Sequence, residues 1–100
     1  MIINLPDGMG VLLFLIPGSP QLMDETMLSM RQHQVVVWSR HGVIVRADDS
    51  LDHALDLVEY IETAAHYEGL NLCTAEKSTG IPPDQLRAIA EKWNVRQKMF

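Results

Sequence analysis

The chain has 100 residues, 47% of them hydrophobic and 21% charged, a balance that excludes a disordered chain and suits one domain. Its formal net charge of −5 excludes a basic surface for nucleic acid, and its longest apolar run, residues 11–16, is too short to cross a bilayer. The single cysteine, Cys73, cannot form an intrachain disulfide, and the first residues lack the pattern of a signal peptide, so we expect a cytoplasmic protein that binds neither nucleic acid nor membrane.

A strand and a helix are the first elements predicted. The run GVLLFLIPG, residues 10–18, is bounded by glycines and predicts a buried strand, although a buried loop would show the same pattern. Ser19 is a typical N-cap and Pro20 suits the first helical position, so a helix begins here. The spacing of three and four residues gives this helix an apolar face of Leu22, Met23, Thr26, Met27 and Met30. We interpret its methionines as core residues rather than as a pliable binding surface.

Two apolar runs follow, separated by a short polar stretch. The runs VVVW, residues 35–38, and GVIV, residues 42–45, are rich in β-branched residues and predict strands that are buried on both faces. The sequence Ser-Arg-His between them therefore marks the turn that joins the strands.

Two helices complete the predicted order. Ser50 is the expected N-cap of a long helix that extends at least to His66, with Gly69 as either a C-cap or a tolerated interior glycine. Its predicted inner face is Leu51, Ala54, Leu55, Val58, Ile61 and Ala65. Pro83 opens a last helix, whose predicted inner face is Leu86, Ile89, Ala90 and Trp93. Strand, helix, two strands, long helix and short helix together indicate a mixed α/β fold with layered packing.

Most of the polar residues have ordinary structural interpretations. His33 follows the first helix and is expected to interact with its C-terminal carbonyl groups, whereas His53 lies in a first helical turn and is expected to be solvated. His66 and Cys73 are seven residues apart, which is a weak metal-binding signal. The carboxylates of the helices fall on predicted polar faces, so the residues themselves indicate no acid–base pair.

His41, in the turn between the two predicted strands, is the candidate functional residue. A single histidine after a strand is more often a hydrogen-bonded structural residue than a metal ligand. Gly42, which follows it, would let a backbone or a ligand approach closely where a side chain would block the way.

Several short motifs in order give the chain a resemblance to a known family. PDGMG precedes the apolar run, PGS opens the first helix, and HQVVVW is followed by HGV. In this order and spacing they resemble the class II, zinc-dependent sugar-phosphate aldolases, a family that also contains adducin-like proteins, over roughly residues 4–94. The resemblance implies that residues 1–100 form a single partial domain, the C-terminal half of a layered α/β/α domain.

The resemblance also implies a function. Such aldolases reversibly cleave a ketose 1-phosphate to dihydroxyacetone phosphate and an aldehyde, with a zinc ion held by three histidines. The last of these corresponds to His41, and Gly42 beside it keeps the site open. The other two histidines and the catalytic glutamate of the family belong to a part that precedes the matched region. We therefore expect no activity from this chain alone, and either self-association, as in the oligomeric parent enzymes, or binding to a complementary N-terminal segment. The alternative is a non-catalytic, adducin-like structural or interaction module.

Overall fold

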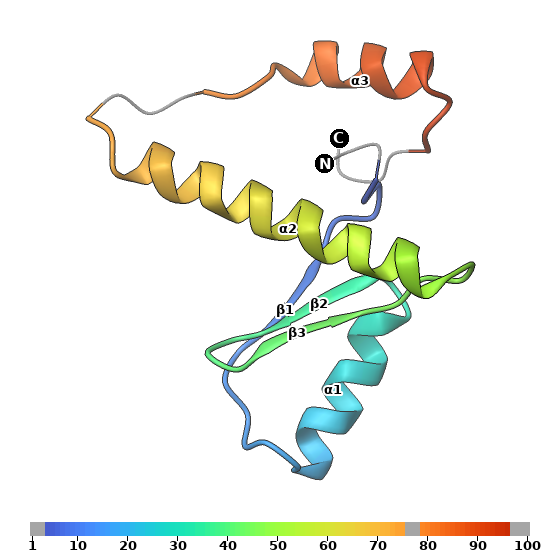
Figure 1. The fold of residues 1–100 in the computed structure, drawn as a ribbon, viewed down its shortest axis with the longest axis vertical. Coiled ribbons are helices and arrows are strands. Elements are labelled where there is room, and N and C mark those ends of the chain that lie inside the picture. The colour runs from blue at the N-terminus through green and yellow to red at the C-terminus, as the bar shows by residue number, and fades with distance from the viewer. Residues whose placement is uncertain (1–3, 76–78, 97–100) are drawn as a thin grey trace.

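A computed structural model describes residues 4–75 and 79–96 of the chain. Along these residues the elements are β1 (Gly10–Leu12), α1 (Pro20–Met30), β2 (Val35–Trp38), β3 (Gly42–Val45), α2 (Leu51–Leu72) and α3 (Pro83–Lys92) (Figure 1). The predicted order of strand, helix, two strands, long helix and short helix is confirmed.

The three strands form one mixed sheet in the order β1-β2-β3. β1 runs parallel to β2, with Gly10 opposite Val36, whereas β3 runs antiparallel to β2, with Ile44 opposite Val36. Because successive side chains of a strand point to opposite faces, this register assigns each residue of β2 to one of two helical layers.

The two faces of the sheet are covered by different helices. Val35 of β2 and its partner Val45 pack with Leu57 and Ile61 of α2. Trp38, on the other face of β2, is hydrogen-bonded to Thr26 of α1. Figure 1 shows α1 and α2 on opposite sides of the sheet, with α3 beyond α2. The predicted layered α/β/α packing is therefore confirmed.

Helices α1 and α2 begin where the sequence predicts. The Ser19 Oγ accepts a hydrogen bond from the Leu22 N–H at 3.2 Å, and Pro20 is the first helical residue. The Ser50 Oγ accepts one from the His53 N–H at 3.0 Å. Each cap satisfies one of the amide groups that the first turn of a helix leaves without an intrahelical acceptor.

The apolar run after residue 10 differs from its prediction as a buried segment. Only Gly10–Leu12 is strand, and the side chains of Leu13, Phe14 and Ile16 are 84%, 58% and 70% exposed. No element of the described chain covers them. The high hydropathy of the segment predicts burial, but a covering surface is needed for burial to occur.

Two further predictions about burial are wrong for this chain. In α1, Leu22 and Thr26 are buried, but Met23 and Met27 are exposed and do not fill the core. In β3, Gly42 and Val43 are exposed and the next two residues only half-buried, so burial on both faces is seen only near the start of β2.

The inner faces of α2 and α3 are also shifted from the prediction. Leu57, which the predicted face omits, is fully buried and Ile61 largely so, whereas Leu51 and Leu55 are exposed. In α3, Ala90 is buried, but Trp93 is exposed at the C-cap. The periodicity of a helix gives the width of its apolar stripe, whereas the contact with the sheet decides which edge of that stripe is buried.

The end of α2 shows whether Gly69 is a C-cap or an interior glycine of the helix. The helix continues to Leu72, and Cys73 is its C-cap. Gly69 is therefore an interior helical glycine, and its interpretation as a C-cap is wrong.

The hydrophobic core is small for the size of the chain. Its main cluster consists of Leu5, Val35, Leu57 and Ile61, with Val45 packed against it, and the other buried hydrophobic residues described are Leu22, Val36 and Ala90. The radius of gyration is 15.2 Å, whereas a compact domain of this length has about 13 Å. Among the described residues, no helix combines the length and the hydropathy that crossing a membrane would require. The elements are thus arranged as layers, but much apolar surface is left outside the core.

Candidate functional site

His41 lies in the tight turn that joins β2 to β3. Its backbone N–H donates to the Trp38 carbonyl oxygen at 3.0 Å, which closes a four-residue turn. Arg40, at the third position of this turn, has a φ of +63°, as that position of a type II turn requires. Trp38 and Gly42 pair directly across the base of the turn, so the position of the His41 backbone is fixed by two strands.

The turn is located at the carboxyl end of the parallel strand pair. β1 and β2 end on the same edge of the sheet, and the Ser39 N–H donates to the Leu12 carbonyl oxygen at 3.0 Å, which extends their pairing. Figure 1 shows the turn beside the segment that leaves β1 for α1. Ligands of α/β sheets bind outside the carboxyl ends of the strands, so the fold places His41 on the edge where a site would be expected.

The side chain of His41 is exposed at this edge. Its ring centroid is 5.3 Å from that of Trp38, with an angle of 35° between the ring planes. A Cβ atom added at Gly42 would meet no atom within 4 Å among the described residues beyond its chain neighbours, His41 and Val43. Among the described residues the imidazole thus has an aromatic contact with Trp38, and the neighbouring Gly42 is surrounded by space that residues beyond His41 and Val43 do not fill.

Trp38 is itself held by α1. The Trp38 Nε1–H donates to the Thr26 Oγ1 at 3.0 Å, and the Thr26 hydroxyl donates to the Leu22 carbonyl oxygen at 2.5 Å. Trp38 also lines an apolar groove of about 530 Å³, together with Met23, Met27 and Ile44. Neither Trp38 nor Thr26 is among the site residues that the sequence predicts. A tryptophan at a strand end and a lone hydroxyl on an apolar helix face are the signals that point to such a pair.

His33 has a structural partner that differs from the one predicted. Its backbone N–H donates to the Ser29 carbonyl oxygen at 3.0 Å, but its ring Nδ1 contacts the Asp7 carbonyl oxygen at 2.9 Å. A carbonyl oxygen can only accept, so the Nδ1 of His33 carries the hydrogen. The ring thus links the turn before β1 to the end of α1 instead of interacting with the helix carbonyls.

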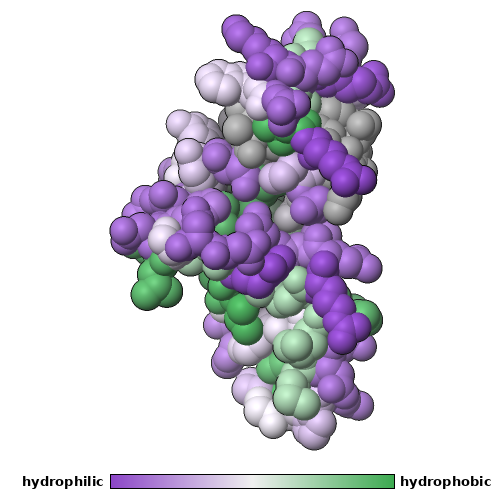
Figure 2. All heavy atoms as spheres, turned by 90° about the vertical axis from the view of Figure 1, so that its right-hand side faces the viewer, coloured by the Kyte–Doolittle hydropathy of each residue, from purple (hydrophilic) through white to green (hydrophobic). Residues whose placement is uncertain are grey.

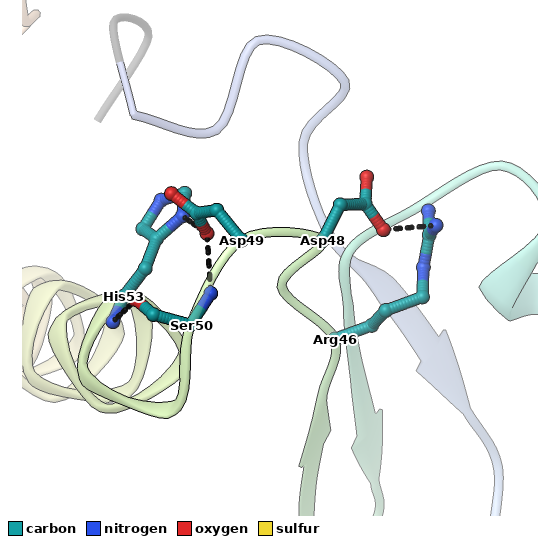
Figure 3. Close-up of polar contacts among 5 residues, drawn as sticks. All are labelled: Arg46, Asp48, Asp49, Ser50 and His53. Carbon is teal, nitrogen blue, oxygen red and sulfur yellow. Dashed lines mark hydrogen bonds and ion pairs between the residues drawn. The ribbon is translucent and has the colours of Figure 1, made fainter.

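His53 forms a second polar cluster, at the start of α2, which Figure 3 shows in detail. The Asp49 Oδ1 is 2.6 Å from the His53 Nδ1 and also accepts from the Ser50 N–H at 2.9 Å. The hydrogen bond from His53 is the main reason why the pKa of Asp49 lies below its ordinary value. Arg46 and Asp48 pair separately at 3.0 Å. The predicted solvated position of His53 holds in that its side chain is partly exposed, but the ring is paired with a carboxylate.

The described residues do not form a complete metal centre. His66 and Cys73 are both exposed, and residues 4–75 and 79–96 contain no group of three histidine, cysteine or carboxylate side chains that could hold a metal ion. A catalytic zinc site has about three protein ligands and an open position. The donors of these residues therefore do not fit a self-sufficient zinc site.

Comparison with known proteins supports the family resemblance. No family model matches the chain. The chain is 30% identical over 93 residues, 93% of its length, to an aldolase of Listeria monocytogenes serotype 4a (strain HCC23), and it covers 34% of that relative. It is 31% identical over 90 residues to an aldolase of Yersinia pestis (strain Pestoides F), of which it covers 32%. The layered fold and these relatives together fit a C-terminal fragment of a class II aldolase, as the sequence motifs predict.

The relatives also agree on a particular enzyme of that class. Both carry the name rhamnulose-1-phosphate aldolase. The motifs PDGMG, PGS and HGV, together with the last helix, indicate the same member of the class. The chain spans about a third of the length of these relatives, so most of each relative has no counterpart in it.

Proposed function

We propose that this chain is the C-terminal portion of a zinc-dependent aldolase, and that His41 contributes one ligand to its zinc ion. The reaction would be the reversible cleavage of a ketose 1-phosphate, of the rhamnulose-1-phosphate type, to dihydroxyacetone phosphate and an aldehyde. The observation that carries this proposal is the position of His41, exposed at the carboxyl edge of the sheet beside open space, in a chain similar to aldolases over 93% of its length. We further propose a cytoplasmic location, because the lone exposed thiol of Cys73 suits a reducing compartment.

A single imidazole makes the proposed site depend on other donors. A neutral histidine offers one ring nitrogen to a metal, and a catalytic zinc site has about three protein ligands. We assign the missing ligands and the catalytic base to a complementary N-terminal segment, the counterpart of the two-thirds of the relatives that this chain does not match. We propose that Gly42 keeps the approach to His41 open, since the space around Gly42 holds no side chain other than those of its chain neighbours.

An exposed surface next to the site suits such a segment. We call the side chains of Val11, Leu13, Phe14 and Ile16 the apolar ledge, and all four are more than half exposed. β1, which starts the ledge, pairs only with β2 within the described chain, so its other edge has free backbone groups. Figure 2 shows further hydrophobic surface on another face, in the lower half that contains the sheet and α1. Contiguous apolar surface and a free strand edge are typical of an interface.

The test of the proposed function combines the two parts. The chain is co-purified with the N-terminal segment of the Listeria monocytogenes relative, and zinc content and cleavage of rhamnulose 1-phosphate are measured. We expect the complex to hold zinc and to cleave rhamnulose 1-phosphate, and the chain alone to show no cleavage. His41→Ala should lower zinc affinity by more than about a hundredfold, because loss of a partner that only supports a ligand already costs 10–100-fold.

His66→Ala is the matched control, since His66 is also exposed but lies on α2. If His41→Ala and His66→Ala retain equal zinc affinity and turnover, His41 is not a ligand. Turnover by the chain without a partner would equally contradict the proposal. A stable complex that neither holds zinc nor turns over would indicate the non-catalytic, adducin-like module instead.

A further inference from the structure

We propose that Trp38 is a positioning residue, which holds the His41 imidazole in one orientation, and that Thr26 fixes Trp38 in turn. This inference rests on the proposed function of His41 for its purpose, but it concerns the geometry of the chain itself. It adds to the site two residues, one from β2 and one from α1, that act through His41.

The first step is the contact between the two rings. Trp38 and His41 are the first and last residues of the turn, and the backbone hydrogen bond between them brings their side chains to the same end of the hairpin. Their ring centroids are 5.3 Å apart and their planes are tilted by 35°, within the range of favourable aromatic pairs. An exposed imidazole on a turn would otherwise rotate freely about its two side-chain torsions. The indole face removes part of that freedom.

The second step is the anchor of the indole. A positioning residue is useful only if it is itself fixed, and Trp38 Nε1–H donates to the Thr26 Oγ1 at 3.0 Å. The hydroxyl hydrogen of Thr26 is directed at the Leu22 carbonyl oxygen, which leaves an oxygen lone pair for the indole. Thr26 is 8% exposed and is the single buried polar side chain among the described residues. Its hydroxyl is therefore oriented by the helix and specific for a donor at the position of Trp38.

The third step is the consequence for the site. His41 is exposed at the carboxyl edge of the sheet, and the space around Gly42 is free of side chains other than those of its chain neighbours, so an imidazole held by Trp38 stays accessible there. A ligand whose geometry exists before the metal or substrate arrives loses less conformational freedom on binding. The contacts from Thr26 of α1 to Trp38, and from Trp38 to His41, thus hold an exposed turn residue against a rigid helix.

Nuclear magnetic resonance of the metal-free chain tests this arrangement. The Trp38 ring should shift the carbon-bound imidazole protons of His41 from their positions in an unstacked ring, and Trp38→Leu should abolish that shift. Trp93→Leu is the matched control, because Trp93 is exposed at the end of α3, and it should leave His41 unchanged. Thr26→Val, which removes the acceptor at nearly constant volume, should reduce the shift and increase the mobility of the His41 ring. Thr26→Ser retains the hydroxyl, so its ring-current shift and its His41 ring mobility should be those of the wild-type chain.

Each outcome decides the question. If His41 shows no ring-current shift in the wild-type chain, or if Trp38→Leu leaves it in place, Trp38 does not position the imidazole. If Trp38→Leu does not fold, the comparison of Thr26→Val with Thr26→Ser decides alone, and equal His41 spectra for the two variants overturn the proposal. Because no metal is present, failure here leaves His41 as a candidate ligand. Failure of zinc binding by the complex likewise leaves the fixed ring in place.

Discussion

Asp49 shows how a single charged residue organises the start of a helix. Its carboxylate accepts from the Ser50 N–H and from the ring of His53, while Ser50 caps the first turn of α2. The hydrogen bond from His53 is the largest contribution that lowers the pKa of Asp49 below 3.8. The cluster is exposed, so solvent screens it and its effect on stability is modest.

The lowered pKa of Asp49 predicts a pH dependence of folding. A carboxyl group whose pKa is lower in the folded chain stabilises the fold above its ordinary pKa, and this contribution is lost as the pH falls through the lowered value. Asp49→Asn, which cannot titrate, should therefore be less stable than wild type near neutral pH, and the two curves should converge below about pH 4. Urea unfolding at a series of pH values measures the difference.

Asp56→Asn is the control for this comparison, because Asp56 is exposed on the same helix. Asp56→Asn removes a carboxylate from the same helix without removing a hydrogen bond to a side chain among the described contacts, so it separates the loss of the Asp49 cluster from the loss of one negative charge. A constant difference between Asp49→Asn and wild type from about pH 2 to about pH 5 would show that the charge of Asp49 does not stabilise the fold.

Individual elements tolerate substitution according to what their backbones contact. Gly10 in β1 lies against the end of α1, where an added Cβ would collide with the Ser29 Oγ and come within 3.1 Å of the His33 ring. Gly69 lies inside α2, where an added Cβ would meet nothing within 4 Å. The same chemical change at these two glycines should therefore have opposite effects.

We expect Gly10→Ala to destabilise the chain by about 1–3 kcal/mol, because a side chain must be accommodated between β1 and α1. Gly69→Ala should stabilise it by about 0.5–1 kcal/mol, because alanine restricts the unfolded chain and favours the helix. Chemical denaturation of both variants and wild type measures these differences. A Gly10→Ala chain as stable as wild type would mean that β1 does not pack this closely on α1.

The starts of the elements were predictable for a local reason. Ser19 and Ser50 cap helices by contacting amides three residues ahead, and Arg40 lies in a turn between two β-branched runs. Such interactions involve neighbours in the sequence, so the pattern of residues contains them. The buried face of α2 was not predicted correctly, because Leu57 is selected by its contact with Leu5 and Val35, residues more than 20 positions away.

The whole molecule is an open layered fold with a small core. The apolar ledge lies outside that core, and the radius of gyration of 15.2 Å exceeds the value of about 13 Å for a compact domain of this length. A small hydrophobic core supplies little stability in a chain of this size. A partner that covers the ledge would therefore stabilise the fold as well as complete the proposed site.

We expect Leu13→Asp to weaken binding of the complementary segment by tenfold or more, since burial of a central apolar side chain in an interface is worth about 1–2 kcal/mol. Leu72→Asp is the control, because Leu72 is comparably exposed but lies at the far end of α2. Titration calorimetry with the N-terminal segment of a relative measures both affinities. Equal affinities would exclude the ledge from that interface. Sedimentation showing a dimer of the chain that Leu13→Asp dissociates would assign the ledge to a second copy.

The sequence by itself determined the order of the elements, the caps of the two long helices, the turn that contains His41 and the resemblance to class II aldolases. All of these depend on residues that are close together in the chain or on short motifs. Only the tertiary structure decided which apolar residues are covered, and that Thr26 of α1 and Trp38 of β2 meet beside His41. Burial and such contacts depend on which surfaces the folded layers bring together, and hydropathy along the chain does not specify those surfaces.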